Sequence, residues 1–372
     1  MIHPLKASSK FCKVLLSSPT RLQGNYSQED LLIEPVSPNM MGIHSIQNKR
    51  FDRLEPEILF GKYHYMLVLN IPENEEDSIF IPDYSYVGDY ISVALSVLYG
   101  KKFENHGMIE GSGFFWMPHY EDLIAFYPDR YYPVYSSFSR KDVNVNLELK
   151  ECGSIVNFTI HGKDKKLFNY FFNADSFYLS SIKSIRFDLD KAYLDLITCG
   201  EILSSFYNYP EEELYSHDQK LEQILKRLVS YNVPDEDVSF IKNRLYQVKR
   251  KFVLTLNNLI NESFFKNTES RVENARFTKE NFEKNIKAAY DLRSRYVHVG
   301  FEFKDWLGVY AGNERNLSEL QIPGLIPNVD DRELKKIIEQ APTYMGLERM
   351  IRFALLRFLH TNGVYIHSDL DS

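Results

Sequence analysis

Short runs of β-branched and aromatic residues, separated by turn residues, dominate the first half of the chain. Such runs have the length and the residue types of β-strands. The expected strands are Tyr63–Ile71, Ser78–Ile81, Phe114–Met117, Leu123–Tyr127, Val143–Leu149 and Ile155–Ile160. Between them, apolar residues return every three or four positions from Gly88 to Tyr99, which predicts one helix that ends before Gly100. Residues 1–187 are therefore predicted to form one β-rich α+β domain.

The spacing of the apolar residues changes near Asp190, where a helical period begins and continues through the rest of the chain. Five helices are expected, at Asp190 to just before Pro210, 221–228, Pro234 to Leu259, Thr278 to Gly300, and Tyr344 to His360. Residues 308–328 are rich in Gly and Pro and indicate a looser connection. Five amphipathic helices can share one core, so residues 188–372 are predicted to form an all-helical bundle.

The length and composition agree with two globular domains. A chain of 372 residues exceeds the usual size of one domain. No apolar run approaches the roughly 20 residues that span a bilayer, so no membrane partner is expected. Lys6, Lys10 and Lys13 interrupt the apolar residues of the N-terminus, which leaves no core for a secretory signal. A cytoplasmic location is the resulting expectation.

Several residues with possible binding chemistry do not form a recognisable pattern. The three cysteines are far apart and never in a C-x-x-C pair, so we expect reduced, mostly buried thiols without a disulfide or zinc site. Glu104, His106 and Glu110 lack the spacing of a metal centre. Gly111–Gly113 lacks the Lys-Ser/Thr of a phosphate-binding loop. Neither a metal nor another cofactor is predicted.

The net charge of -7 argues against nucleic-acid binding through the overall field of the protein. Any contact with RNA must therefore be local. Two groups of basic residues are candidates for such a contact, or else for a solvated helix face. They are Arg244, Lys249, Arg250 and Lys251, and on the last helix Arg349, Arg352 and Arg357.

The segment AAYDLRSRYVHVG, near the end of the fourth expected helix, contains Arg293 and, after four intervening residues, His298. An arginine can donate two parallel hydrogen bonds to a phosphate. An imidazole titrates near neutrality and can act as a general acid or base. Positions five apart differ by about 140° around a helix, so the two side chains are expected to flank a groove rather than stack on one face.

Together with the preceding Tyr290-Asp291-Leu292 and with Gly300, this segment resembles the signature helix of the HEPN superfamily, especially its Apea-like branch. The resemblance covers residues 190–365. It implies a metal-independent endoribonuclease with Arg293 and His298 as its catalytic pair, and Ser294, Arg295 and Tyr296 as supporting residues. Ser294 stands where Asn is the commoner residue.

The resemblance also implies partners and a cellular role. Many HEPN ribonucleases act as toxins or in bacterial antiviral defence and abortive infection. One histidine cannot serve both sides of an in-line displacement, so a homodimer through the C-terminal helical domain is expected. The N-terminal domain is then expected to sense a trigger, such as a phage-derived or inhibitory protein.

Two other interpretations remain open. Arg293 can instead be a structural arginine whose guanidinium pairs with Glu201 or Asp291, while His298 caps the end of its helix. The bundle would then be an RNA-binding or dimerisation scaffold without cleavage. Alternatively, the function resides in the N-terminal domain, where Trp116 and neighbouring aromatic residues could face a protein or glycan ligand.

Overall fold

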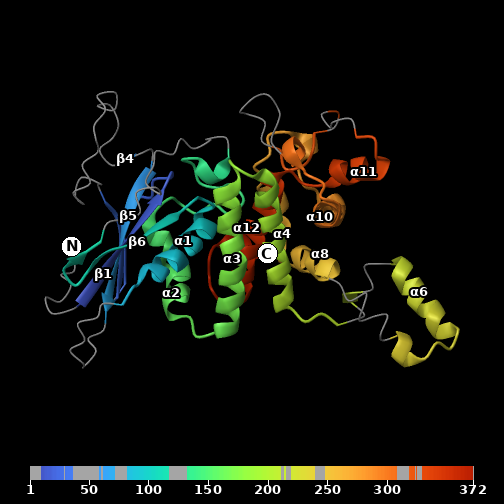
Figure 1. Ribbon diagram of the computed structural model, residues 1–372, viewed down its shortest axis with the longest axis horizontal. Coiled ribbons are helices and arrows are strands. Elements are labelled where there is room, and N and C mark those ends of the chain that lie inside the picture. Colours follow the sequence, from blue (N-terminus) through green and yellow to red (C-terminus); the bar gives the residue numbers. More distant parts are fainter. Residues whose placement is uncertain are drawn as a thin grey trace. The chain divides into compact units, whose positions relative to one another are not determined.

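The computed structural model describes most of the chain (Figure 1). The described residues are 10–28, 30–36, 58–59, 62–71, 82–116, 132–210, 213–214, 219–238, 248–307, 318–322, 324 and 329–371. The chain divides into two compact units, residues 1–165 with 363–368 and residues 166–362 with 369–372. We call them the sheet unit and the helical unit. Their secondary structure confirms the predicted α+β class.

The sheet unit is built around one antiparallel sheet. The strand order is β2-β3-β5-β1-β6-β7, and β4 pairs with β5. The strands are β1 (Lys10–Ser18), β2 (Tyr26–Gln28), β3 (Leu31–Val36), β4 (Ile58–Leu59), β5 (Lys62–Ile71), β6 (Glu104–Gly111) and β7 (Phe114–Phe115). Strand β5 confirms the expected strand at Tyr63–Ile71, and β7 confirms part of Phe114–Met117. The strands expected at Ser78–Ile81 and Leu123–Tyr127 lie outside the described residues.

Strand β1 was not predicted, and its place in the sheet explains why. It lies between β5 and β6, and its residues Val14, Leu15 and Leu16 are fully buried. A strand that is buried on both faces lacks the alternation of apolar and polar residues that identifies a strand in a sequence. The two neighbours of β1 supply the partners for its backbone, and only the folded sheet brings them together.

Helix α1 (Ser85–Tyr99) confirms the helix expected from Gly88 to Tyr99. Gly100 ends it in the left-handed conformation, with φ of 59°. At Gly88, a side-chain Cβ would lie 2.6 Å from Val14 and 2.5 Å from Asn105, so the absence of a side chain lets α1 approach β1 and β6. Contacts with both strands place α1 directly against the sheet.

Two expected strands of the sheet unit are wrong. Residues 155–160 belong to helix α2 (Gly153–His161), where Ile155, Val156, Phe158 and Thr159 are buried at helical spacing. Residues 143–148 are irregular apart from an isolated bridge between Glu148 and Gln23, and Leu149 is the first residue of the 3-10 helix η5 (Leu149–Cys152). The β-branched residues suggested strands, but burial of one helical face outweighs this weak intrinsic preference.

The helical unit contains the remaining helices. They are α3 (Lys165–Ser184, whose first residue belongs to the sheet unit), α4 (Leu189–Phe206), α6 (Gln219–Ser230), α8 (Val248–Leu259), α9 (Glu262–Lys266), α10 (Lys279–Val299), α11 (Arg332–Gln340) and α12 (Tyr344–Thr361). Short 3-10 turns are η4 (Pro133–Tyr135) in the sheet unit, then η6 (Glu273–Ala275), η7 (Lys304–Leu307) and η8 (Ser368–Leu370). Helix α4 packs against α8, α10 and α12, and α11 packs against α10.

The helices expected from Asp190, from Thr278 and from Tyr344 are confirmed by α4, α10 and α12. Thr278 is the N-cap residue of α10, although its side chain makes no capping hydrogen bond. Helix α6 confirms the one expected at 221–228, but it does not share the main core: Leu225 and Val238 form a separate small apolar cluster. Helix α8 confirms the last part of the long helix expected up to Leu259, while residues 239–247 lie outside the described residues.

The helical unit begins earlier than the predicted boundary at 187/188, because α3 is bound to α4 and α12. The Tyr178 hydroxyl donates to Glu348 at 2.6 Å, and the Ser181 hydroxyl donates to the Ala192 carbonyl at 2.7 Å. Helix α3 was not predicted. Within the part of the chain that the structure describes, no helix has both the length and the apolar character of a membrane span.

Candidate functional site

Helix α10 carries the Arg293 and His298 motif in its last two turns. Phe282, Ile286 and Ala289 are buried on its inner face and fix its position in the bundle. Gly300 ends it in the left-handed conformation, with φ of 69°, immediately after Val299. His298 therefore lies in the final turn, and Arg293 lies one and a half turns before it.

Arg293 lies beside a carboxylate of the neighbouring helix α4. Its Nη2 is 3.5 Å from Oε1 of Glu201, and the side chains of Arg293 and Glu201 are 29% and 15% exposed. The guanidinium carbon also lies 5.6 Å from the ring centre of Tyr290. Of the two carboxylates considered for Arg293 from the sequence, Glu201 is the one that the fold places next to it.

The hydrogen-bonding capacity of the Glu201 carboxylate is only partly used in this arrangement. Its Oε1 is buried and accepts no hydrogen bond within the described part of the chain. Burial raises the pKa of Tyr290 to about 12, and the Glu201 carboxylate adds to this rise as acceptor and as a negative charge. Arg293, Tyr290 and Glu201 thus form a polar cluster in which the contact between Arg293 and Glu201 is electrostatic.

A second ion pair links the same helix to α8. Lys249 Nζ lies 2.5 Å from Oδ1 of Asp291, with both side chains about one third exposed, at 34% and 38%. The Lys249 ammonium is therefore neutralised by Asp291. Arg250 is half-buried on α8, and Arg244 lies outside the described residues.

His298 is exposed, and its imidazole makes no hydrogen bond or ion pair among the described residues. Five positions separate it from Arg293, which corresponds to about 140° around the helix and about 7.5 Å along it. One protomer therefore does not stack the guanidinium and the imidazole on the same helix face. Both groups remain accessible from solvent at the end of α10.

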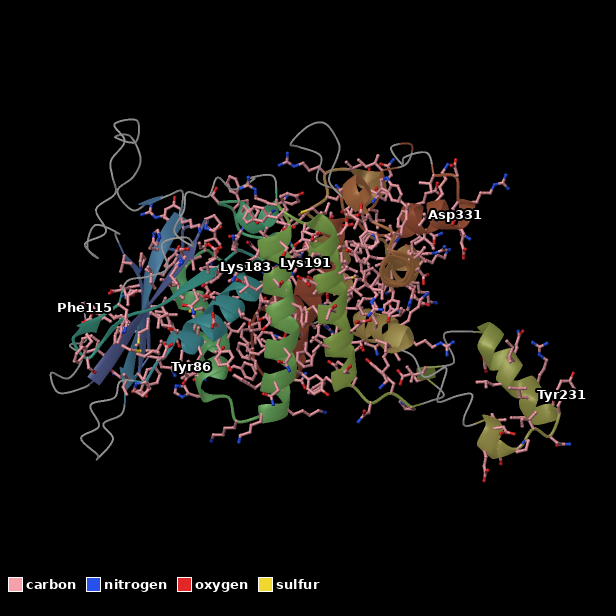
Figure 2. All side chains as sticks on the ribbon, viewed as in Figure 1. Tyr86, Phe115, Lys183, Lys191, Tyr231 and Asp331 are labelled. Atoms are coloured by element: carbon pink, nitrogen blue, oxygen red, sulfur yellow. The ribbon has the colours of Figure 1, made fainter. Side chains whose placement is uncertain are left out.

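The three supporting residues differ in their surroundings. Ser294 is half-buried. Arg295 donates to Glu333 of α11 at 2.7 Å and lies 3.7 Å from Asp331, the N-cap of that helix (Figure 2). Tyr296 packs on Phe303 with ring centres 5.2 Å apart, and burial together with nearby acidic residues raises its pKa. Arg295 and Tyr296 thus contact structural neighbours of α10.

Two of the three arginines on the last helix that were candidates for a local RNA contact or for a solvated helix face fit neither interpretation. Arg349 and Arg352 are 1% and 0% exposed. Arg349 donates to Glu319 at 2.8 Å and to the Phe264 carbonyl, which makes it an internal tie between segments of the helical unit. Only half-buried Arg357, whose guanidinium donates to the Leu370 carbonyl at 2.7 Å, is in part accessible. Arg349 and Arg352 are therefore unavailable to RNA.

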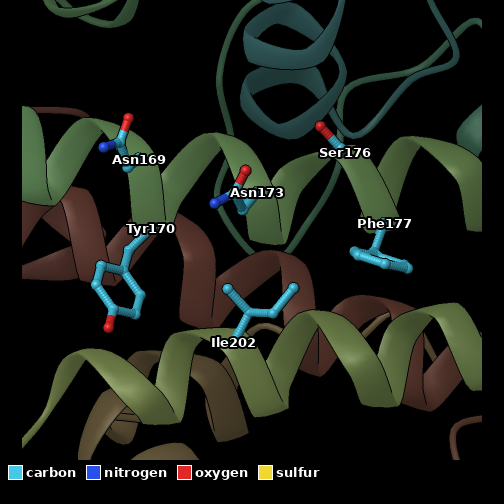
Figure 3. Close-up of a pocket in the computed structure, with 6 residues that line it drawn as sticks. All are labelled: Asn169, Tyr170, Asn173, Ser176, Phe177 and Ile202. Carbon is cyan, nitrogen blue, oxygen red and sulfur yellow. The ribbon is translucent and has the colours of Figure 1, made fainter.

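A shallow pocket of about 470 Å³ lies between α3 and α4 (Figure 3). It is lined by Asn169, Tyr170, Asn173, Ser176, Phe177 and Ile202. Helix α4 therefore faces the pocket with Ile202 and faces α10 with the adjacent residue Glu201. The lining contains amides, hydroxyls and aromatic rings but no carboxylate, imidazole, ammonium or guanidinium group, so it does not supply the charged and proton-transferring side chains proposed for phosphodiester cleavage.

The acidic and histidine side chains noted in the sheet unit are structural. Glu104 is bound by Lys62 at 2.5 Å and by Lys102 at 2.7 Å; burial opposes ionisation, but the two ammonium groups hold its pKa at about 2. His106 shares a 2.7 Å hydrogen bond with Ser17, and Glu110 accepts from Lys13 at 2.5 Å. Within the described ranges, no group of three potential ligands could hold a metal ion.

The remaining sequence candidates are distributed as follows. Cys12, Cys152 and Cys199 are buried free thiols, as expected. Trp116 is 41% exposed beside the exposed Phe114 and Phe115 of β7 (Figure 2). Ser112 and Gly113, the latter with φ of 90°, form the turn between β6 and β7, and Gly111 is the last residue of β6.

Comparison with known proteins adds no relative to this description: no protein-family model, curated protein or solved structure gives a significant match.

Proposed function

We propose that this protein is a metal-independent endoribonuclease that cleaves RNA by attack of the neighbouring 2′-hydroxyl. One observation carries the proposal: a partly exposed Arg293 and an exposed His298 end the same helix of an all-helical unit. This placement agrees with the resemblance of the segment to the HEPN signature helix. A cytoplasmic location and a role in bacterial antiviral defence or in a toxin system belong to the same proposal.

Each residue has a distinct role in the proposed reaction. The Arg293 guanidinium binds the scissile phosphate and stabilises the negative charge that develops on it. The His298 imidazole transfers a proton, either from the attacking 2′-hydroxyl or to the departing 5′-oxygen. The products are a 2′,3′-cyclic phosphate and a 5′-hydroxyl, and the reaction requires no metal.

We further propose that two copies of the helical unit form the complete site. The two proton transfers occur on opposite sides of the phosphorus, and one imidazole cannot reach both. A two-fold axis near the end of α10 would bring two histidines and two arginines to one phosphate. The sheet unit would then receive the activating signal, such as a phage-derived or inhibitory protein.

The first experiment is RNA cleavage by the purified full chain in EDTA. Wild type is compared with Arg293→Ala, His298→Ala and, as a control, Lys284→Ala, which removes an exposed cation from the same helix. We expect cleavage by wild type and by the control, and loss of at least about a hundredfold in each motif variant. Cleavage that survives both motif substitutions would contradict the assigned pair, as would products with 5′-phosphate ends.

The contact between Arg293 and Glu201 favours a second candidate, an RNA-binding or dimerisation scaffold without cleavage. In that case Arg293 would serve packing and charge balance. The same assay separates the two functions when RNA binding is measured in parallel. Binding without cleavage under any condition, together with a dimer in solution, would support the scaffold.

A further inference from the structure

We propose that Glu201 is a positioning residue that holds the Arg293 guanidinium in the resting protein and releases it when a phosphate of RNA binds. The inference rests on the proposed function, because it assigns a regulator to the same site. It adds a residue from a different helix, some ninety positions earlier in the chain, to the motif on α10.

The geometry of the pair indicates a contact that can be exchanged. At 3.5 Å, Nη2 of Arg293 and Oε1 of Glu201 attract each other electrostatically but form no hydrogen bond. A phosphate can offer the guanidinium two parallel hydrogen bonds, which the carboxylate in this position does not. The exchange therefore replaces a weak contact with a stronger one.

The surroundings of the pair allow Arg293 to change partners. Its side chain is 29% exposed, so the guanidinium can move toward solvent without first opening the core. The Tyr290 ring lies 5.6 Å away and can stay near the cation during the exchange. Tyr290 also interacts with Glu201, so the carboxylate keeps a polar neighbour after Arg293 has left.

The local charge explains why Glu201 matters for substrate affinity. Arg293 and Lys249 provide two positive charges, and Glu201 and Asp291 provide two negative charges. These four groups sum to zero and offer little attraction to a polyanion. Removing the Glu201 charge leaves an excess of one positive charge beside the proposed phosphate site, and RNA affinity should increase.

The test uses an RNA that is 2′-O-methylated at every sugar, which blocks 2′-hydroxyl attack and separates binding from cleavage. Its dissociation constant is measured for the full-length wild type and for Glu201→Gln, Arg293→Ala and the double variant. Glu283→Gln is the matched control, because it removes one carboxylate from an ion pair with Lys287 on α10 and makes the same change in net charge.

We expect Glu201→Gln to bind this RNA about two to five times more tightly than Glu283→Gln, the size expected for a partly exposed pair. The gain should vanish when Arg293 is also replaced by Ala. With cleavable RNA, Glu201→Gln should lower KM more than it changes kcat. Tighter binding that persists without Arg293 would overturn the proposal, because the effect would then come from general charge.

The outcomes also separate this inference from the proposed function. If wild type binds RNA and Arg293→Ala weakens binding, but Glu201→Gln equals its control, only the role of Glu201 is overturned. If neither wild type nor any of the variants binds or cleaves RNA, both proposals are overturned. Should Glu201→Gln fail to fold, Glu201→Asp takes its place, because the shorter side chain keeps the charge but withdraws it from Arg293. We again expect tighter RNA binding than for wild type. An affinity equal to that of wild type would contradict the proposal.

Discussion

Two arginine–glutamate pairs in the helical unit show how differently the same two residue types can be used. Arg349 and Glu319 are almost fully buried, with side chains 1% and 3% exposed, and are joined at 2.8 Å. Arg293 and Glu201 are 29% and 15% exposed and approach only to 3.5 Å. The first pair is surrounded by protein on all sides, whereas the second borders solvent.

The partners of the buried pair show what it stabilises. The Glu319 carboxylate accepts from the Thr268 hydroxyl at 2.5 Å and from the Phe277 backbone at 3.1 Å, and Arg349 donates to the carbonyls of Phe264 and Asn267. These bonds tie α12 and the segment that contains Glu319 to α9 and to the residues between α9 and α10. The pair of Arg293 and Glu201 instead involves few neighbouring groups, so Arg293 can change its partner without disturbing the contacts of the other groups.

The largest effect is expected for Glu319→Gln, which leaves the Arg349 charge buried without a counter-ion. Loss of one partner from a buried pair destabilises a protein by about 3–5 kcal/mol. Urea denaturation should therefore give a much lower unfolding free energy than for wild type. Glu201→Gln serves as the comparison and should lose less than about 1 kcal/mol, as expected for a pair bordering solvent. Similar losses in the two variants would abolish the distinction between the pairs.

The next largest effect concerns activity. Arg293→Ala should lower RNA cleavage by about a hundredfold to a thousandfold, or roughly 2.7–4 kcal/mol, because it removes charge stabilisation of the transition state. Its unfolding free energy should change by less than about 1 kcal/mol. Initial cleavage rates and urea denaturation of the same preparation measure both quantities. A large loss of stability would instead identify Arg293 as a structural residue.

A smaller effect is expected when the backbone around the buried pair is displaced. At Gly346, a Cβ would lie 2.0 Å from the Glu319 carbonyl oxygen, a distance that no structure tolerates. Gly346→Ala must shift Glu319 or α12, and we expect destabilisation of about 1–3 kcal/mol from overpacking. Gly300→Ala provides a contrast, because a Cβ at this position would meet no atom within 4 Å. Any loss of stability in this variant must therefore come from the φ of 69°. Thermal unfolding compares the two.

The smallest effect concerns the response to salt. A double-mutant cycle on Arg293 and Glu201 should give a coupling of about 0.5 kcal/mol that decreases in 1 M NaCl, because mobile ions screen charges near solvent. The coupling between Arg349 and Glu319 should change little, since salt does not enter the core. Equal sensitivity of the two couplings to salt would contradict the difference in burial on which the comparison rests.

The chain itself determined much of the helical unit. The boundaries of α4, α10 and α12 could be predicted because the apolar period of a helix is local, and Gly300 marks the end of α10 through its own backbone freedom. In the sheet unit, Gly100 marks the end of α1 in the same way. The position of Arg293 and His298 near the end of α10 could be predicted from the same helical period and from Gly300. Strand β5 was predictable from its β-branched and aromatic residues.

The tertiary structure decided which groups meet. The sequence left Glu201 and Asp291 as equal partners for Arg293, and only the packing of α4 and α8 against α10 assigned Glu201 to Arg293 and Lys249 to Asp291. It also buried Arg349, which the sequence made a candidate for an RNA contact or a solvated helix face, and it made residues 155–160 a helix. Local spacing fixes the period of an element, but pairing across the chain depends on distances that exist only once the core has formed.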